Sequence, residues 1–518
     1  MSRRVVTVAS LVFLSSIFSF SHAALAERVF YVDPDWLGPA NGSASAPWTS
    51  LTAVAWTTIN AALAIDDVTV YFSARNAASD TNETTTAALS IARTDMSTHR
   101  LTFDGMSQYN TSDTSPSWLP YTGSSRFQIT TTYPVTTANN LSGVERNYWT
   151  LRGFRVIATN GQQLFMTAVR HVIVENNHFS SDLTGVPVAS RVGPGVIVSK
   201  PVLATSIAGV DVTIRNNIIH DTFGEGIYIG GYYACGEGAP LPCPGFGAGD
   251  TLLIENNTIY DTGTWGEEGD SIDIKDAWTN VTVRGNTIYN NNYGTGSQQQ
   301  DGIITNSAAV IEGNFIYNKR RNGITLTAFY GAFNGFWTGA VVRNNVIVNC
   351  GLGTDSWGYG IAYPEKIGVF AFVTPQIYNN TVYGMNKPGA PGAARGIYIG
   401  PTVETTVDVY NNIVSGTNGS DFESAAGKLS THGNNDYWHS GAGVTVATYG
   451  SSLYTSATLT AFESNSLSVN PLFVNTAPPY LVTNFGLQST SPLCGRNMGA
   501  IPCGAGTTPQ APTNTKLQ

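Results

Sequence analysis

The feature of this 518-residue chain that most constrains its fold is a short unit repeated along its middle. Each unit joins an alternating strand, an Asn-rich corner and a second short strand, as in "VTIRNNII" and "LLIENNTI". Such periods are typical of solenoids, and short strands at this spacing predict an all-β chain folded as a right-handed parallel β-helix. The second asparagine of the corner recurs in steps of 40, 40, 29, 28, 31, 35 and 32 residues, at Asn177, Asn217, Asn257, Asn286, Asn314, Asn345, Asn380 and Asn412.

Stacking of coils explains the pattern physically. A single coil cannot bury its own inner face, whereas stacked coils share a continuous core of Ile and Val, with equivalent side chains about 4.8 Å apart. Asparagine at a corner tolerates left-handed backbone and can hydrogen-bond its counterparts in the coils above and below. We therefore interpret the repeated asparagines as a structural ladder and not as a sugar-binding site. The composition agrees, because 54 glycines describe a chain with many turns.

A second strand aligns the same coils in "EGIYIGG", "DSIDIKD", "DGIITNS" and "NGITLTA". Alternation along each strand directs one set of side chains inward and leaves the residues between them facing solvent. The inward pairs are expected to be Ile227/Ile229, Ile272/Ile274, Ile303/Thr305 and Ile324/Leu326.

The repeat predicts one continuous domain. Residues 27–145 are expected to form an N-terminal cap and the first coils, residues 146–425 the β-helix, and residues 426–518 further coils and a closing segment. A short amphipathic helix near the N-terminus would cap one open end of the core, and the segment from "NPLFVN" onwards would close the other. Both end segments resemble the terminal pieces of secreted right-handed β-helix proteins.

The first 26 residues are expected to be a signal peptide. Two arginines precede an apolar run over residues 5–20, and small residues at positions 24 and 26 suit cleavage before Glu27. A membrane anchor is the alternative, but the run is short for a bilayer and a cleavage-like site follows it at once. We therefore expect a secreted, extracellular protein.

Five cysteines are compatible with export. Cys235 and Cys243 would close one short loop, and Cys494 and Cys503 another. Cys350 is then left over and is expected to be buried and unpaired.

The charge balance restricts the partners. A net charge of -9 and a pI near 5.3 argue against nucleic acid or an anionic membrane, because neither finds a broad basic surface. An acidic polysaccharide would need a local basic patch or a bridging metal ion. We expect the protein to act as a monomer.

Charge is concentrated in one stretch, "EEGDSIDIKD", from Glu267 to Asp276, although only 12% of the chain is charged. Stacking places the residue before each "G-I" strand in one column, here called the acid column. Carboxylates at such spacing repel one another, so they require either raised pKa values with proton sharing or a bound cation. Hard oxygen ligands without a nearby thiolate or histidine favour Ca²⁺. The acid column comprises Glu225, Asp270, Asp301 and Asn322, and Glu268 can project on the same side.

Basic residues near the acid column could hold a substrate. Lys275 follows the strand of Asp270 and could either pair with Asp273 or Asp276 or act on a substrate. Two coils later, "NKRRNG" supplies a run that could clamp substrate carboxylates or sulfates or could form a solvated corner. This run is Lys319, Arg320 and Arg321.

The segment "EGDSIDIK" resembles the calcium and base segment of the chondroitinase B and alginate lyase family of β-helix polysaccharide lyases. The resemblance implies that Glu268 and Asp270 bind Ca²⁺ and that Lys275 is the general base. The family's arginine would fall near Asn306, which is not basic, so Arg320 or Arg321 would have to replace it. Calcium-dependent pectate lyases are similar more loosely, through the strand pattern and Asp301.

This chemistry links the base to the metal ion. In β-elimination a base removes the proton at C5 of a uronate, which is acidic enough only when the neighbouring carboxylate is neutralised. A lysine can be that base only when burial or a nearby cation lowers its pKa. Beside uncompensated carboxylates Lys275 would stay protonated, so its role as base depends on the calcium site.

Aromatic side chains near this face could stack on sugar rings. The candidates for substrate contact are Tyr228, Trp265, Tyr330, Trp337 and Trp357.

The leading function predicted from the sequence is a secreted polysaccharide lyase that cleaves a uronate-containing glycan with Ca²⁺. The alternative is a glycoside hydrolase that uses paired carboxylates without a metal ion, chosen from Glu225, Asp270, Asp273 and Asp301. A non-catalytic glycan-binding protein is the third possibility, since a fold alone implies no activity.

Overall fold

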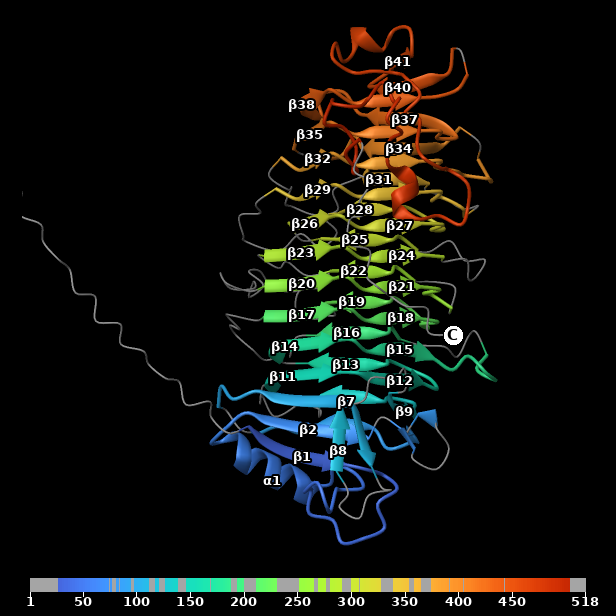
Figure 1. The fold of residues 1–518 in the computed structure, drawn as a ribbon. Helices are drawn as coiled ribbons and strands as arrows, with labels where there is room; N and C mark the ends of the chain where they lie inside the picture. Colours follow the sequence, from blue (N-terminus) through green and yellow to red (C-terminus); the bar gives the residue numbers. More distant parts are fainter. Residues whose placement is uncertain are drawn as a thin grey trace, which may run out of the picture.

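The chain folds into a right-handed parallel β-helix, as the repeat predicted (Figure 1). The computed structural model describes residues 27–73, 75–76, 81–82, 84–94, 97–110, 117–120, 126–137, 146–167, 169–187, 193–199, 211–230, 251–264, 269–275, 280–290, 300–306, 308–327, 339–353, 358–364, 374–390, 392–403, 405–441 and 443–503.

Three long sheets form the walls of the coil stack, and almost all neighbouring strands in them are parallel. Within the described residues the first sheet has 14 strands: β1 (Arg28–Val32), β2 (Val68–Ser73), β7 (Leu101–Asn110), β11 (Arg146–Arg152), β14 (Val169–Glu175), β17 (Asp211–Arg215), β20 (Thr251–Glu255), β23 (Asn280–Arg284), β26 (Ala309–Glu312), β29 (Val341–Arg343), β32 (Gln376–Tyr378), β35 (Val407–Tyr410) and β38 (Leu429–Gly433), with β8 (Ser117–Pro120) beside β7.

The other two walls follow the same order along the stack. The 12-stranded sheet comprises β5 (Thr84–Thr85), β9 (Phe127–Thr131), β12 (Phe154–Ala158), β15 (His178–Ser181), β18 (Ile218–His220), β21 (Thr258–Tyr260), β24 (Thr287–Tyr289), β27 (Phe315–Tyr317), β30 (Val346–Val348), β33 (Thr381–Tyr383), β36 (Ile413–Ser415) and β39 (Asp436–Trp438). The 13-stranded sheet comprises β6 (Leu89–Ile91), β10 (Val135–Thr137), β13 (Leu164–Thr167), β16 (Val196–Ser199), β19 (Ile227–Ile229), β22 (Ile272–Ile274), β25 (Ile303–Thr305), β28 (Ile324–Leu326), β31 (Tyr359–Tyr363), β34 (Ala394–Ile399), β37 (Gly419–Ser424), β40 (Thr445–Tyr449) and β41 (Ser452–Thr455). A separate short pair joins β3 (Arg75–Asn76) to β4 (Thr81–Asn82).

The register of the 13-stranded sheet confirms the alignment read from the sequence. Ile227, Ile272, Ile303 and Ile324 lie opposite one another on successive strands, and all four are fully buried. The outward residues between the core pairs were expected to face solvent, and this was wrong for most of them. Asp273, for example, is only 1% exposed although it projects from the outer face of the sheet.

The asparagine ladder is present, and it divides two tasks between neighbouring residues. The first corner residue takes the left-handed backbone, as at Asn256 with φ 55°. The second corner residue is fully buried and makes the hydrogen bonds, as at Asn257, whose Nδ2 donates to Ile214 O (2.9 Å) and to Asn286 Oδ1 (3.0 Å). The same ladder continues beyond the predicted repeats to Asn435, which accepts the backbone N–H of Asn412 at 2.9 Å.

Different elements cover the two ends of the core. Helix α1 (Ala53–Leu63) begins at Thr52, whose hydroxyl accepts the Ala55 N–H, and it buries Trp56 against Phe103 at the N-terminal end. At the other end a short 3₁₀ turn, η3 (Leu459–Ala461), places Leu459 in the main core. Within the described residues no helix is long and apolar enough to cross a membrane.

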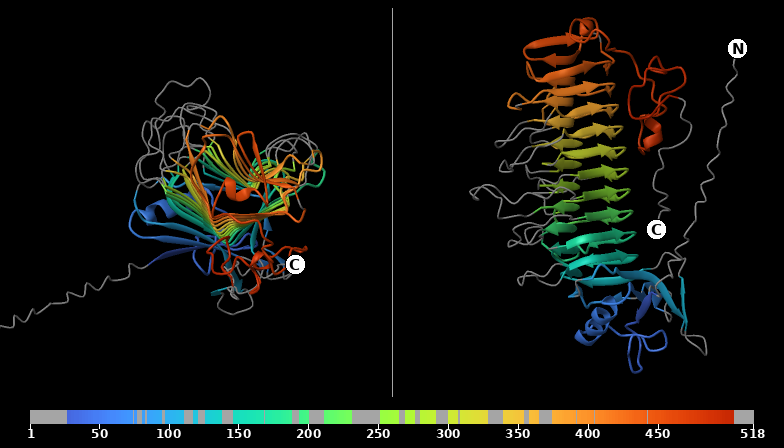
Figure 2. Two further views of the ribbon diagram at one scale, coloured as in Figure 1. Left: turned by 90° about the horizontal axis from the view of Figure 1, so that it is seen from above. Right: turned by 90° about the vertical axis from the view of Figure 1, so that its left-hand side faces the viewer.

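The C-terminal segment lies along the side of the stack, whereas the sequence suggested that it closes the end (Figure 2). Its apolar residues, which include Phe485 in η4 (Val482–Phe485), form a second core on the outer face of the 12-stranded sheet. Phe315 and Val346 are among the sheet residues in that core. The Ala500 N–H donates to Thr381 Oγ1 at 2.9 Å, which ties the segment to β33.

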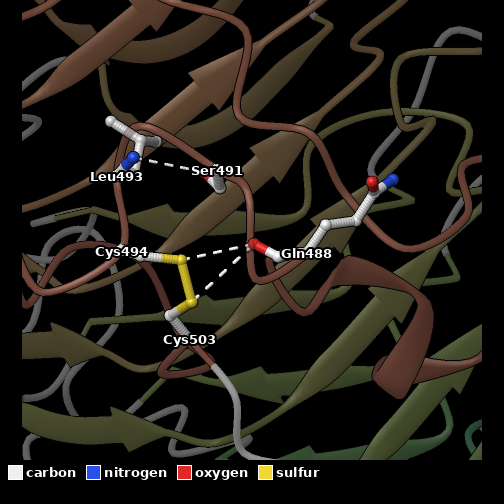
Figure 3. The surroundings of a disulfide bond; sticks show 5 residues. All are labelled: Gln488, Ser491, Leu493, Cys494 and Cys503. Carbon is white, nitrogen blue, oxygen red and sulfur yellow. Dashed lines mark hydrogen bonds between the residues drawn. A yellow bond between two sulfur atoms is a disulfide. The ribbon is translucent and has the colours of Figure 1, made fainter.

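A disulfide closes the C-terminal segment, as predicted (Figure 3). It joins Cys494 to Cys503, and the two sulfurs lie 3.3 and 3.7 Å from the carbonyl oxygen of Gln488. Cys350 is free and buried in the core, as expected. The predicted Cys235–Cys243 pair lies outside the described residues.

Candidate functional site

The acid column is a second ladder that runs along one corner of the 13-stranded sheet. Asp270 Oδ1 accepts the backbone N–H of Asp301 (2.6 Å), and Asp301 Oδ1 accepts that of Asn322 (2.9 Å). Asn322 Oδ1 in turn accepts the N–H of Tyr359 at 3.0 Å. These three ladder side chains are fully buried, and Glu225 on the preceding coil is 5% exposed. The column predicted from the sequence is therefore real, and its side chains hold the backbone of adjacent coils together.

Lys319 enters the same buried corner from the turn after β27. Its ammonium donates to Ser271 Oγ at 2.8 Å, and the side chain is fully buried. Burial lowers the pKa of Lys319 to about 8, although the carboxylates of Asp270 and Asp301 favour its charged form. This position does not fit the predicted contact with substrate, because the ammonium faces the interior and offsets the charge of the acids.

The carboxyl group of Asp270 is unusual in this corner. Burial raises its pKa well above the ordinary value, and the charges of Asp301 and Asp273 raise it further. Its Oδ2 has no hydrogen-bond partner among the described residues. A carboxyl in this position is stable when it carries a proton.

The described residues do not fit a calcium site. Three of the four carboxylate oxygens of Asp270 and Asp301 already accept protein hydrogen bonds, because Asp301 Oδ2 takes the Thr325 hydroxyl at 2.8 Å. No group of three or more His, Cys, Asp or Glu side chains in the described part of the chain could hold a metal ion. Glu268, the remaining predicted ligand, lies outside the described residues.

Asp273 and Lys275 form an ion pair beside the acid column, with Asp273 Oδ2 and Lys275 Nζ 2.9 Å apart. Asp273 projects from the outer face of β22, between the core residues Ile272 and Ile274. Burial disfavours the Lys275 ammonium, but the carboxylates of Asp273 and Asp270 outweigh it and raise the pKa of Lys275. The ion pair was one of the two alternatives that the sequence left open.

The two arginines of the basic run have different surroundings. Arg321 Nε lies 3.8 Å from Asp301 Oδ1, so its charge is directed at the acid column. Arg320 is 7% exposed, and its backbone carbonyl accepts the Gly353 N–H. Asn306, at the place of the missing arginine, donates to the Lys275 carbonyl at 2.9 Å.

Tyr228 is the one aromatic candidate for substrate contact that the structure describes. It lies in register with Asp273 on the neighbouring strand β19, and it is half-buried. The other predicted aromatic contacts lie outside the described residues; they are Trp265, Tyr330, Trp337 and Trp357.

Sequence reasoning missed Ser271, although a signal for it exists. The equivalent position in neighbouring coils is glycine, because a Cβ at Gly302 would lie 2.4 Å from the carbonyl oxygen of Gly323. Ser271 breaks this rule, and its hydroxyl is the group that receives Lys319. The serine in a column that is otherwise glycine therefore identifies the coil on which Lys319 meets the acid column.

A comparison with protein-family models agrees with the fold. A family model described as "Right handed beta helix region" matches residues 206–365, which include the acid column. No curated protein matches the chain. A GH136 lacto-N-biosidase from Eubacterium ramulus is similar over 85% of this chain and 68% of its own, with 11% identity and a TM-score of 0.31. A mutant DFA-IIIase from Arthrobacter chlorophenolicus A6 is similar over 82% and 86%, with 12% identity and a TM-score of 0.25. Neither similarity says what this chain binds or cleaves.

Proposed function

We propose that the protein is a carbohydrate-active enzyme that hydrolyses a glycan at the outer face of the 13-stranded sheet, around Asp273. The observation that carries the proposal is the contrast between two carboxyl groups on one coil. Burial raises the pKa of Asp270 and favours its protonated form, whereas Asp273 forms an ion pair with the Lys275 ammonium at 2.9 Å. Carboxyl groups driven apart in this way are the usual acid and base of glycoside hydrolysis.

Each residue has a defined part in this proposal. Asp273 is the carboxylate that acts as base or nucleophile. Asp270 is fully buried, so as the acid it would pass its proton to the substrate indirectly and not by direct contact. Lys275 holds Asp273 in place and, at 19% side-chain exposure, contacts the substrate. Tyr228, next to Asp273 in the sheet, offers a ring for a sugar.

The lyase activity suggested by the sequence has weaker support. A lysine base needs a lowered pKa, and the pKa of Lys275 is raised. Lys319 has a lowered pKa, but it is fully buried in the interior. Three of the four carboxylate oxygens of Asp270 and Asp301 already accept protein hydrogen bonds, which gives a calcium-dependent reaction little support.

We also propose that the protein is exported and acts as a monomer on a polysaccharide. The Cys494–Cys503 disulfide supports an oxidising compartment. The coverage of both ends of the core by α1 and η3 supports a monomer, because uncovered end coils would pair with other chains.

Digestion of a panel of neutral and acidic glycans tests the activity. Hydrolysis would release reducing ends without the ultraviolet absorbance of an unsaturated uronate, whereas elimination would produce both signals. Release of that absorbance would replace the hydrolase by the lyase. Absence of both signals across the panel, with binding retained, would leave a glycan-binding protein.

A further inference from the structure

Two histidines on the outer face of the 12-stranded sheet direct their ring nitrogens at each other. His178 begins β15 and pairs in register with Ile218, and His220 ends the adjacent strand β18. Their Nε2 atoms are 2.6 Å apart, and their ring centroids are 4.8 Å apart. Both side chains are half-buried, so a small ion in solution can reach them.

Asp221 fixes the tautomer of one histidine. Its carboxylate accepts the proton of His220 Nδ1 at 2.6 Å, which leaves the lone pair of His220 Nε2 free to face His178. A carboxylate behind an imidazole is the usual second-shell support of a metal-bound histidine. Asp221 therefore holds the His220 ring in the orientation that a metal ligand needs.

Neutral imidazole is the form that binds metal ions. Arg155 and Arg126 act on His178 electrostatically, and Asp221 opposes them. Asp261 on the next coil adds a second negative charge near His220. The two acids thus offset the two arginines around the histidine pair.

We propose that His178 and His220 form a binding site for a divalent transition-metal ion of the zinc-to-copper series. Imidazole nitrogens favour these ions over calcium or magnesium. With bonds of about 2.0–2.1 Å, two nitrogens on one tetrahedral ion lie ~3.3 Å apart, so the rings need to separate by less than ~1 Å. Water would fill the remaining positions, because the site offers only two protein ligands. Such an ion would join two adjacent coils through strands β15 and β18.

Titration calorimetry of the full chain, purified without a histidine tag, tests the site with Zn²⁺ and Cu²⁺. The expected result is one ion per chain, with Cu²⁺ bound more tightly. His178→Ala and His220→Ala should each weaken binding at least ~10-fold, and Asp221→Asn by about 10–100-fold. His171→Ala is the matched control, since His171 pairs with Asp211 at 2.9 Å but has no second imidazole beside it among the described residues. It should bind like the parent.

Two results would overturn the proposal. One is the absence of Zn²⁺ and Cu²⁺ binding to the parent chain, and the other is unchanged affinity in the double variant of His178 and His220. Glutamine variants at the two positions keep the test available if an alanine variant does not fold, and circular dichroism checks each fold. Asp273→Asn should leave metal binding unchanged, so the outcome is independent of the proposed glycan activity.

Discussion

The asparagine ladder, here also called the asparagine column, and the acid column both join adjacent coils through hydrogen bonds to side-chain oxygens. Only the asparagines can also donate hydrogen bonds to one another. Asn257 donates as well as accepts, since its Nδ2 bonds to Ile214 O and Asn286 Oδ1 while its Oδ1 accepts the Asn217 N–H. A carboxyl group lacks the two N–H donors of an amide. Asp270 therefore keeps an oxygen without a partner among the described residues, and its corner draws in Lys319.

This difference separates a structural column from one that can carry chemistry. Amides satisfy one another at any pH, so the asparagine column has no titratable group to contribute. The acid column contains buried carboxyl groups, and the buried side chains of Lys319 and Ser271 lie beside them on the same coils. Buried charge is costly, and perturbed carboxyl groups are concentrated at functional sites, which favours the acid column as the place of function.

The largest effect is expected from removing the buried cation. Lys319→Met should lower the free energy of unfolding by about 3–5 kcal/mol, because it leaves the charge of Asp301 in the interior without the Lys319 ammonium. Denaturant titration measures the loss. Adding Asp270→Asn should restore part of it, since the two residues interact. A loss below about 1 kcal/mol would mean that the acids do not need Lys319.

A break in the asparagine column should come next. Asn257→Ala leaves several buried backbone and side-chain groups without partners, at about 1–3 kcal/mol for each, so we expect a loss of about 3 kcal/mol. Asn256→Gly is the matched control, because Asn256 has φ 55° and glycine stands at the same corner in the next coil, at Gly285 with φ 63°. Its unfolding curve should stay close to that of the parent. Equal losses for both variants would contradict the division of tasks at the corner.

A smaller effect, with a defined pH dependence, is expected at Asp270. Its pKa is raised in the folded state, so the native protein loses stability as pH rises from the ordinary carboxyl range through the raised pKa. Asp270→Asn removes this loss and should be more stable than the parent at neutral pH. The advantage should shrink below pH ~4, where the unfolded carboxyl is also protonated. Melting temperatures from pH 3 to 8 check this, and a constant difference would contradict the raised pKa.

The smallest effect belongs to charge pairs outside both columns. Arg284 pairs with Glu255 at 2.7 Å on the 14-stranded sheet, and its side chain is 49% exposed. Arg284→Ala should cost less than about 1 kcal/mol in urea titration, because exposed ion pairs are screened and flexible. A loss of stability above that value would show that ion pairs on the surface stabilise the fold as much as the buried charges around the acid column.

Most of the fold could be predicted from the sequence because a solenoid repeats local information. The spacing of Asn217, Asn257 and Asn286 gives the coils, and alternation in "DSIDIKD" gives the inward residues. The path of the C-terminal segment could not be predicted. Phe485 and its neighbours have no repeat to align them, and their partners in β27 and β30 are far away in sequence.

The site was predicted in part. The acid column follows from stacking alone, whereas the sequence left open whether Lys275 forms an ion pair or acts as a base. The inward direction of Lys319 could not be predicted, because it follows a left-handed residue, Asn318 with φ 56°, that turns the chain before the next strand. In the sequence, Lys319 looks like its neighbours Arg320 and Arg321 on a charged turn.

Turnover of Asp273→Asn on the glycan that the parent degrades tests the central claim most directly. Asp273 is proposed to act on substrate, so kcat should fall by about 10²–10⁴ while the melting curve keeps its cooperative form. Glu423→Gln is the matched control, since Glu423 pairs with Arg395 on the same sheet, away from the acid column. Its turnover should match the parent. Parent-like kcat in Asp273→Asn would contradict a catalytic role for this carboxylate and, with it, the proposed hydrolase.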